Sequence, residues 1–386
     1  MPEVIVRGFG LTSALGQGAR TNAEALLACQ TGVCLHPDLP WVPPNIPIAL
    51  VRQPGPQTRS PGDGLELLAG PIQEALAMAG MSQVELSRSG IFYGTTSGFY
   101  QTDDIRVWES HKADPNATNA MLSRGFGWVG SEIGRMVGRK GTGPVINFSA
   151  ACISSAAALV EAIKWVAMGK VEHAIVVGYE TVLRATACGF RTMLLTDLSG
   201  PKPFDRRRAG TSAGEGCAAL VLSSSGRGQR LLGGRTLLDP TSATNHHPEG
   251  LIGQRMIAQL FDDCGIGPGK VTAIKAHGTG TVDNDYHEAK VLNGIFGQRL
   301  PPLSALKGAM GHCMGAAGLM EVAAWLACLD EGLLPPAHGF TEPDPQLQVA
   351  PLQTPMPAPE GVHLMQYYGF GGAGAAIALD YRKVAK

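Results

Sequence analysis

The sequence predicts an α/β fold with mostly parallel sheets that are covered by helices on both faces. Short apolar runs such as residues 173–178 (HAIVVG) and 217–222 (CAALVL) are typical of strands buried on both sides. Longer apolar segments with helical composition, such as residues 156–170, lie between these runs. The alternation continues along all 386 residues, which can form two domains or one large duplicated domain.

An internal similarity is the second observation. The segment FSAACISSAAALVEAIKWVAMGK begins at Phe148, and GAMGHCMGAAGLMEVAAWLACLDEG begins at Gly308. Each has small residues around one reactive side chain, followed by an apolar helix of similar length. Duplication of an α/β unit explains this similarity, although helical composition alone could mimic it. We place the two halves at residues 1–228 and 229–386.

The individual elements follow from local patterns. The glycine-rich residues 8–10 should end the first strand as a turn, and Gly70-Pro71 should kink or restart a helix. The proline-rich residues 35–64 should form an irregular loop. Strands are predicted at 4–6, 90–95, 173–178, 217–222, 272–277, 302–306, 362–368 and 375–381. Helices are predicted at 23–29, 65–78, 120–137, 156–170, 283–296 and 316–329.

Composition excludes several classes of protein. A net charge of −1 argues against binding nucleic acid or a membrane surface by bulk charge. No apolar run approaches the roughly 20 residues that span a bilayer, and the N-terminus does not resemble a signal peptide. Eight cysteines without a C-x-x-C pair favour reduced thiols in the cytosol over disulfides or zinc. Only 16% of residues are charged, which indicates an oligomer with a large buried interface.

Cys152 is the first candidate for chemistry. An apolar strand (PVINF) delivers it through small residues to the start of a helix. The free N–H groups and partial positive charge at a helix N-terminus favour a thiolate. The alternative is that Cys152 is a small buried hydrophobe, as most lone cysteines are.

Three further segments contain candidate residues. His277 follows a strand in AHGTGT, Lys307 and His312 lie in SALKGAMGHCMG, and Phe370 lies in YYGFGGAG. A lone histidine beside glycines is more often structural than catalytic. Here two histidines, like Cys152, each follow an apolar strand and lie among small residues. A cysteine with two histidines suggests acyl transfer through a thioester.

Other motifs are rejected. Gly369, Gly371 and Gly374 match G-x-G-x-x-G, but a strand follows them instead of a helix, so NAD is excluded. The pairs His246-His247 and His287-Glu288 are too sparse for a metal site and are interpreted as solvated surface. Arg206-Arg207-Arg208 is interpreted as a solvated turn.

Together these segments resemble the elongating β-ketoacyl-acyl-carrier-protein synthases, condensing enzymes related to KAS I and KAS II. The resemblance covers nearly the whole chain in the family's order. It includes VIVRGFGLTSALGQG, NFSAACISS, HAIVVGYE, KPFDRRRAGTSAGEGCAALVL, AHGTGTVDNDYHEAK, SALKGAMGHCMGAAG and YYGFGGAGA. It implies the thiolase-like fold, a duplicated five-layered αβαβα architecture.

The resemblance also implies roles for single residues. Cys152 would be the acyl-accepting nucleophile, and His277 and His312 would complete the Cys-His-His set that assists malonyl decarboxylation. Lys307 would orient the site and pair with an acidic residue, for which Glu288 is the corresponding position. Asp285 falls at a further acidic position of the family. Phe370 would be the gate, and its backbone N–H and that of Cys152 would form the oxyanion hole.

Partners and pathway follow from the same resemblance. The substrates would arrive on the phosphopantetheine arm of an acyl carrier protein, with no metal or nucleotide cofactor. Arg206–Arg208 and Arg124 are candidate docking charges for an acidic carrier. The chain would form a homodimer, or a heterodimer with a chain-length-factor-like subunit. The departures Gln366-Tyr367-Tyr368 and Ala373, the short chain and the loop at 35–64 suggest a specialised pathway, with aryl polyene pigments as the first expectation.

Three rival functions remain at this point. A non-catalytic chain-length-factor-like subunit would lack the nucleophilic cysteine, which is present here. A thiolase would carry a second cysteine near the closing glycine loop, and residues 362–374 contain none. A Cys-His protease would need a glutamine oxyanion donor before the cysteine and would not explain the other segments.

Overall fold

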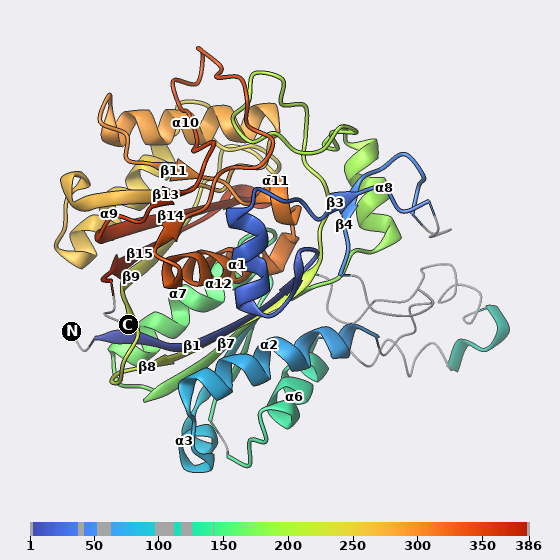
Figure 1. Cartoon of the computed structure of the whole chain (residues 1–386). Helices are drawn as coiled ribbons and strands as arrows, with labels where there is room; N and C mark the ends of the chain where they lie inside the picture. The colour runs from blue at the N-terminus through green and yellow to red at the C-terminus, as the bar shows by residue number, and fades with distance from the viewer. Residues whose placement is uncertain are drawn as a thin grey trace.

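Two sets of five strands with the same order form the frame of the molecule (Figure 1). The computed structural model describes residues 3–37, 42–51, 63–96, 112–116, 126–141 and 143–383. Among these, the first set runs β1 (Val4–Ser13), β8 (Gly216–Ser223), β7 (His173–Glu180), β5 (Gly90–Gly94) and β6 (Val145–Phe148). The second runs β9 (Gln229–Leu238), β15 (Ala373–Tyr381), β14 (Gly361–Gly369), β10 (Val271–Lys275) and β11 (Leu303–Ser304).

The two sets repeat one topology. In each, the first strand pairs with the fifth, the fifth with the fourth, the fourth with the second and the second with the third. The directions also match, since β5 and β10 pair in parallel with both neighbours while the remaining pairs are antiparallel. β1 and β9 pair at residues 4–6 and 229–231, which joins the sets into one large sheet. The duplicated thiolase-like fold is therefore confirmed. The proposed division between residues 228 and 229 falls between β8 and β9.

Helices separate and cover the two sets, which gives five layers (Figure 1). α7 (Ser154–Ala167) and α12 (Ala317–Asp330) lie between the sets, and α1 (Ala19–Leu27) packs beside α12. One outer face carries α2 (Asp63–Ala79), α3 (Gln83–Arg88) and α6 (Phe126–Met136). The opposite face carries α9 (Leu251–Cys264) and α10 (Val282–Phe296). The shorter elements are β2 (Gly16–Gln17), β3 (Val33–Cys34), β4 (Ile48–Ala49), α8 (Arg184–Thr192), α11 (Lys307–Met310), β12 (Leu333–Leu334) and β13 (Met356–Pro357).

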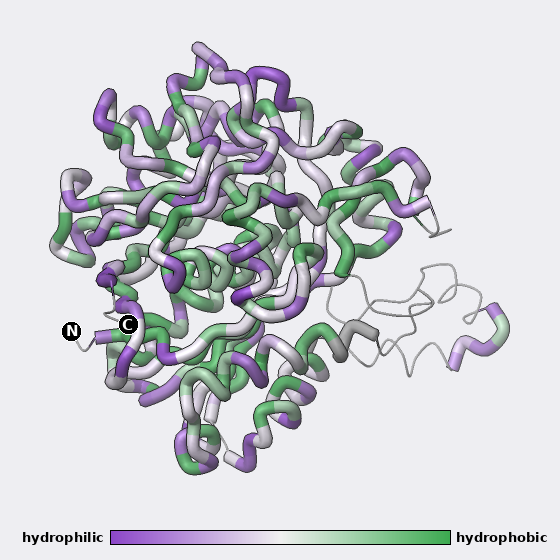
Figure 2. Tube along the Cα trace, in the orientation of Figure 1, coloured by the Kyte–Doolittle hydropathy of each residue, from purple (hydrophilic) through white to green (hydrophobic). Residues whose placement is uncertain are grey.

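The middle layer is the most apolar part of the molecule (Figure 2). Every residue of α12 from Ala317 to Leu329 is buried, as expected for a helix that is hydrophobic on all sides. α7 and α12 approach closely because their contact residues are small. A Cβ on Gly318 would lie 2.6 Å from the backbone nitrogen of Ala156, and the Ser155 hydroxyl accepts a 3.0 Å hydrogen bond from the Leu319 N–H.

Several sequence predictions need correction. The sheets are mixed rather than mostly parallel, because β14 and β15 are joined by only three residues and must form a hairpin. Gly70-Pro71 does not restart a helix, because Pro71 lies inside the single helix α2. β9, α8 and α9 were not predicted. The helix predicted at 120–137 is described only from residue 126, and much of the loop predicted at 35–64 lies outside the described residues.

The first strand is also longer than predicted. β1 continues through Gly8 and Gly10 to Ser13, so these glycines do not form a turn. Both positions require glycine because α2 packs directly against the strand. A Cβ on Gly10 would lie 2.2 Å from the Pro71 carbonyl oxygen, and one on Gly8 would lie 2.2 Å from that of Ala75.

This contact predicts a stability difference between two glycine substitutions. Gly10→Ala should lower the free energy of unfolding by about 2 kcal/mol or more, because α2 must move away from β1. Gly269→Ala, where an added Cβ meets no atom within 4 Å, should change it by less than about 0.5 kcal/mol. Urea unfolding of both variants measures this, and equal midpoints would contradict the assigned role of Gly10.

Candidate active site

Cys152 lies on a tight turn between β6 and α7. Ala151 has a positive φ of 47°, which is uncommon for a residue with a side chain. The Ser154 hydroxyl stabilises the turn, since it accepts from the Ala150 N–H at 2.9 Å and donates to the Ala151 carbonyl at 2.7 Å. α7 begins at Ser154, so the thiol precedes the first turn of the helix and faces a cavity.

Burial acts on the thiol against the effect expected from the start of the helix. Burial raises the pKa of Cys152 to about 11. The positive charge of Lys307 and the backbone N–H groups of Phe370 and Cys152 act in the opposite direction but do not outweigh burial. This pKa favours the neutral thiol over the thiolate at pH 7.

His277 is held from behind by Lys307. Lys307 is completely buried, and its Nζ lies 3.1 Å from His277 Nδ1, 2.7 Å from the His277 carbonyl oxygen and 2.6 Å from Glu321 Oε1. An ammonium group has three N–H donors and no acceptor, so these three bonds use all of them. Nδ1 must then accept, which leaves the proton of the neutral imidazole on Nε2.

His312 forms the second half of a neutral histidine pair. Its ring centroid lies 5.5 Å from that of His277, and the two rings are nearly perpendicular. Its backbone N–H donates to the Ser212 carbonyl at 2.7 Å, which fixes its position after α11. Burial, and next the charge of Lys307, lowers the pKa of both histidines well below the usual value. Both are therefore hydrogen-bonding groups at neutral pH.

The acidic partner of Lys307 is Glu321 and not Glu288, so that prediction was wrong. Glu288 instead accepts from the backbone N–H groups of His277 at 2.6 Å and Gly278 at 2.7 Å, and from Gln366 Nε2 at 2.7 Å. It shapes the turn that carries His277. Burial raises the pKa of Glu288 above its usual range.

Asp285 has a similar structural setting. It accepts from the Phe204 N–H at 2.7 Å and the Gly280 N–H at 3.2 Å, and so connects α10 to two loops beside the cavity. The sequence reasoning missed Glu321 and Lys275, a second buried lysine that contacts the other oxygen of Glu321. A signal for Glu321 existed, because aligning Cys152 with His312 also aligns Glu161 with Glu321 and Trp165 with Trp325.

Phe370 begins the short connection between β14 and β15. Two backbone hydrogen bonds of 2.7 Å tie this connection to the loop after β9, from the Gly371 N–H to the Ala243 carbonyl and from the Asp239 N–H to the Gly372 carbonyl. Gly371 and Gly372 both have positive φ angles near 75°. A Cβ on Gly372 would lie 1.7 Å from the Asp239 carbonyl oxygen, so the two loops fit only with glycine there.

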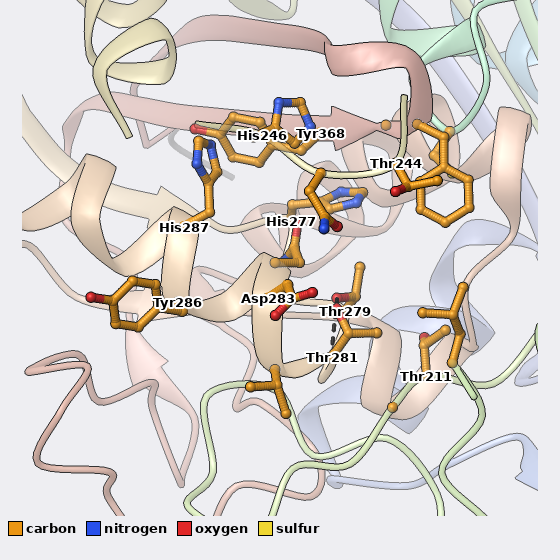
Figure 3. Close-up of a pocket in the computed structure, with 18 of the residues that line it drawn as sticks. Thr211, Thr244, His246, His277, Thr279, Thr281, Asp283, Tyr286, His287 and Tyr368 are labelled. Carbon is orange, nitrogen blue, oxygen red and sulfur yellow. Dashed lines mark hydrogen bonds between the residues drawn. The ribbon is translucent and has the colours of Figure 1, made fainter. Parts of the chain in front are cut away.

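A cavity of about 580 Å³ brings these residues together (Figure 3). Cys152, His277, His312 and Phe370 all line it, whereas Lys307 lies behind His277. In Figure 3, His246, His287 and Tyr368 lie to one side of His277, and Thr279, Thr281 and Thr211 lie to the other. His287 is buried, the His246 side chain is only 10% exposed, and the two rings stack at 4.8 Å, so they are not the solvated surface that the sequence suggested.

The candidate docking arginines differ in exposure. Arg208 is almost buried and pairs with Asp344 at 2.6 Å, so it is a structural residue and not a docking charge. Arg206 and Arg207 are more than half exposed, although Arg206 pairs with Glu342 at 3.1 Å. Arg124 lies outside the described residues.

No helix in the described part of the chain is long and apolar enough to cross a bilayer. No group of three His, Cys, Asp or Glu side chains there converges as a metal site would require.

Comparison with known proteins identifies the family. Residues 64–226 match the N-terminal domain of β-ketoacyl synthases, and residues 234–341 match the C-terminal domain. The chain belongs to the β-ketoacyl synthase family of acyltransferases. It is 27% identical to the 3-oxoacyl-[acyl-carrier-protein] synthase 2 of Mycobacterium bovis, over 98% of this chain and 97% of that protein.

Solved structures show the same fold. The ishigamide ketosynthase/chain length factor superposes with a TM-score of 0.88 at 23% identity, with 99% of each chain covered. A type II polyketide synthase acyl-carrier protein in complex with its ketosynthase, AntDE:AntF, gives a TM-score of 0.84 at 20% identity, again over 99% of each chain.

The raised pKa of Cys152 predicts how the thiol reacts with iodoacetamide. Its alkylation rate should rise about tenfold per pH unit between roughly pH 7 and 10, because the thiolate fraction limits the reaction. Lys307→Met should slow the reaction at each pH, since it removes the charge that favours the thiolate. Peptide mass spectrometry of Cys152 measures both rates, and a plateau near pH 8 would contradict the raised pKa.

Proposed function

We propose that this chain condenses an acyl group held on Cys152 with a malonyl unit carried by an acyl carrier protein, in fatty-acid or polyketide chain elongation. The observation that supports this best is the neutral pair His277 and His312, which faces Cys152 across one cavity while Lys307 fixes the tautomer of His277. The relatives do not support the expected aryl polyene pathway.

The first step is acylation of Cys152. Its sulfur attacks the acyl thioester, the bond from the carbonyl carbon to the pantetheine sulfur breaks, and the thiol proton passes to the departing sulfur. Negative charge develops on the carbonyl oxygen in the tetrahedral intermediate. The backbone N–H groups of Cys152 and Phe370, which act on the thiol in the free enzyme, are the donors proposed for it.

The second step is loss of carbon dioxide from the malonyl group. The carbon–carbon bond to the carboxylate breaks, and its electron pair forms an enolate on the thioester. His277 Nε2–H and the ring of His312 supply hydrogen bonds to the enolate oxygen. Because both imidazoles stay neutral, they can stabilise this charge without first transferring a proton to it.

The third step joins the two units. The enolate carbon attacks the acyl carbonyl on Cys152, and the carbon–sulfur bond breaks to leave a thiolate. The raised pKa of Cys152 means that this thiolate readily takes up a proton from solvent, which restores the resting thiol and replaces the proton that left with the pantetheine sulfur. The hydroxyls of Thr244, Thr279 and Thr281 line the cavity and are suited to bind the amides of a phosphopantetheine arm.

Phe370 is proposed to control access between these steps. It lines the cavity next to Cys152, and its loop is held to the loop after β9 by two backbone hydrogen bonds. Breaking those bonds would let Phe370 leave the cavity while β14 and β15 stay in place.

We further propose that a second chain of the same fold pairs along β6. β6 is the last strand in the sheet order of the described residues, and apolar residues occupy this edge, with Val145 46% exposed. The amide nitrogen of Asn147 is buried without a partner among the described residues. Exposed apolar edges of this kind are normally covered. The partner is a second copy of this chain or a chain-length-factor-like subunit, and such factors occur with ketosynthases among the structural neighbours.

The free cysteines bear on the compartment in which the proposed enzyme acts. All eight cysteines are free, and the proposed nucleophile must remain so, which supports action in the reducing cytosol.

Substitution of the nucleophile and of one histidine tests the reaction. Cys152→Ala should abolish both the acyl-enzyme and condensation. His312→Gln should keep the acyl-enzyme but slow carbon dioxide release from malonyl carrier protein by about 10²–10³-fold. Intact-mass analysis and carbon dioxide release measure the two steps. A wild-type chain that neither accepts acyl groups nor decarboxylates, alone or with a partner subunit, would favour the non-catalytic rival.

Light scattering tests the proposed partner edge. Val145→Lys should weaken self-association of the chain about tenfold, roughly 1.4 kcal/mol, because a charged side chain blocks edge pairing. Met168→Lys is the matched control, since Met168 is also exposed, at 61%, but caps the C-terminal end of α7 and is not part of β6. Equal effects of the two variants would mean that association does not use β6.

A further inference from the structure

Lys275 is a fully buried lysine that the reaction above does not use. It ends β10, two residues before His277, and does not line the cavity. Its Nζ contacts the Glu321 carboxylate and lies 3.4 Å from the Gln366 carbonyl oxygen. The same nitrogen lies 3.5 Å from the centre of the Tyr367 ring, where a cation is attracted to the aromatic face.

Glu321 therefore serves two lysines at once. Oε1 accepts from Lys307 at 2.6 Å, and Oε2 contacts Lys275. The carboxylate comes from the middle of α12, where Glu321 is only 2% exposed. Burying a charged group costs free energy. Burial therefore lowers the pKa of Lys275, although the negative charge of Glu321 acts to raise it.

We propose that Lys275 is a positioning residue for decarboxylation: by binding one oxygen of Glu321, it keeps Lys307 directed at Nδ1 of His277. This inference rests on the proposed function, because it assigns His277 a role toward the malonyl thioester.

The physical reason is competition for Lys307. Its ammonium group is divided between Glu321 and His277, which lie at 2.6 and 3.1 Å. Because Lys275 neutralises part of the carboxylate charge, the electrostatic attraction of Glu321 for Lys307 is limited. Without Lys275, the whole negative charge of Glu321 acts on Lys307, and the bond to His277 Nδ1 weakens. His277 could then move its proton to Nδ1 and lose the donor that faces the substrate.

Lys275 also acts on His277 by charge. The cationic groups that lower the pKa of His277 are Lys307 and Lys275, and His312 and His246 would do so when protonated. Glu288, Glu321, Tyr367, Tyr368 and Cys152 are the other titratable groups around it. Removing the charge of Lys275 raises the pKa of His277. His277 is then protonated at a higher pH than in the wild type, and it no longer acts there as a neutral donor.

Lys275→Met separates this role from a structural one. It leaves Glu321 paired with Lys307, so no buried charge is orphaned, and replacing a buried ion by an apolar residue is often tolerated. Lys275→Arg restores the charge. Lys170→Met is the matched control, because Lys170 also lies over an aromatic ring, that of Trp165, but is exposed. If Lys275→Met does not fold, Lys275→Gln removes the charge while keeping a hydrogen-bond donor.

The test measures carbon dioxide release from malonyl-pantetheine across pH, and Cys152 acylation by intact mass. We expect Lys275→Met to lower the decarboxylation rate about tenfold, move the acid limb of its pH profile to higher pH and leave acylation within about twofold. Lys275→Arg should recover most of the rate, and Lys170→Met should match the wild type.

Two results would overturn the inference. One is an unchanged decarboxylation rate and pH profile in Lys275→Met. The other is an equal loss of acylation and decarboxylation with no shift of the acid limb, which would mean that Lys275 only supports the fold. A wild-type chain without decarboxylation would instead overturn the proposed function, so the two failures are distinguishable.

Discussion

The contact between α7 and α12 is the constraint on which the rest of the structure depends. Gly318 and Ala156 allow the two helices to approach closely, and the Ser155 hydroxyl caps the contact by accepting from the Leu319 N–H. Cys152 precedes one helix and His312 precedes the other. The distance between Cys152 and His312 is thus set by small residues in the middle layer, and a larger side chain there would separate them without touching either.

Burial determines the protonation states of the side chains in and around the cavity. His277 and His312 stay neutral because they are buried near the positive charge of Lys307, and the thiol stays protonated because burial outweighs the same charge. One lysine therefore acts on all three groups, lowering the pKa of each. The protein keeps its reactive groups uncharged until a substrate brings negative charge into the cavity.

Much of this arrangement is visible in the sequence. The internal similarity predicted the duplication, and the short motifs around Cys152, His277, Lys307 and His312 indicated residues that the fold brings together. The pairing of Lys307 was not predictable in the same way. The internal alignment marks Glu321 through Glu161, but Glu288 lies closer to His277 in the sequence. Only the fold shows which of these carboxylates reaches the ammonium group.

Local sequence patterns also could not predict the direction of neighbouring strands or the exposure of single side chains. Buried strands look alike whether their neighbours run parallel or antiparallel, so their composition did not show that the sheets are mixed. Only the short connection between β14 and β15 indicated a hairpin. Arg206 and Arg208 are neighbours in one basic run, yet one is exposed and the other is almost buried against Asp344. Periodicity describes one element at a time, and these properties depend on what packs against it.

The position of β6 has a consequence for how the protein would respond to concentration. β6 ends at Phe148, only four residues before Cys152, and the strained turn at Ala151 lies between them. A chain that pairs along β6 holds this turn from outside, and a separated chain loses that support. If the proposed roles of Cys152 and of the β6 partner hold, specific activity should fall on dilution together with the fraction of paired chains.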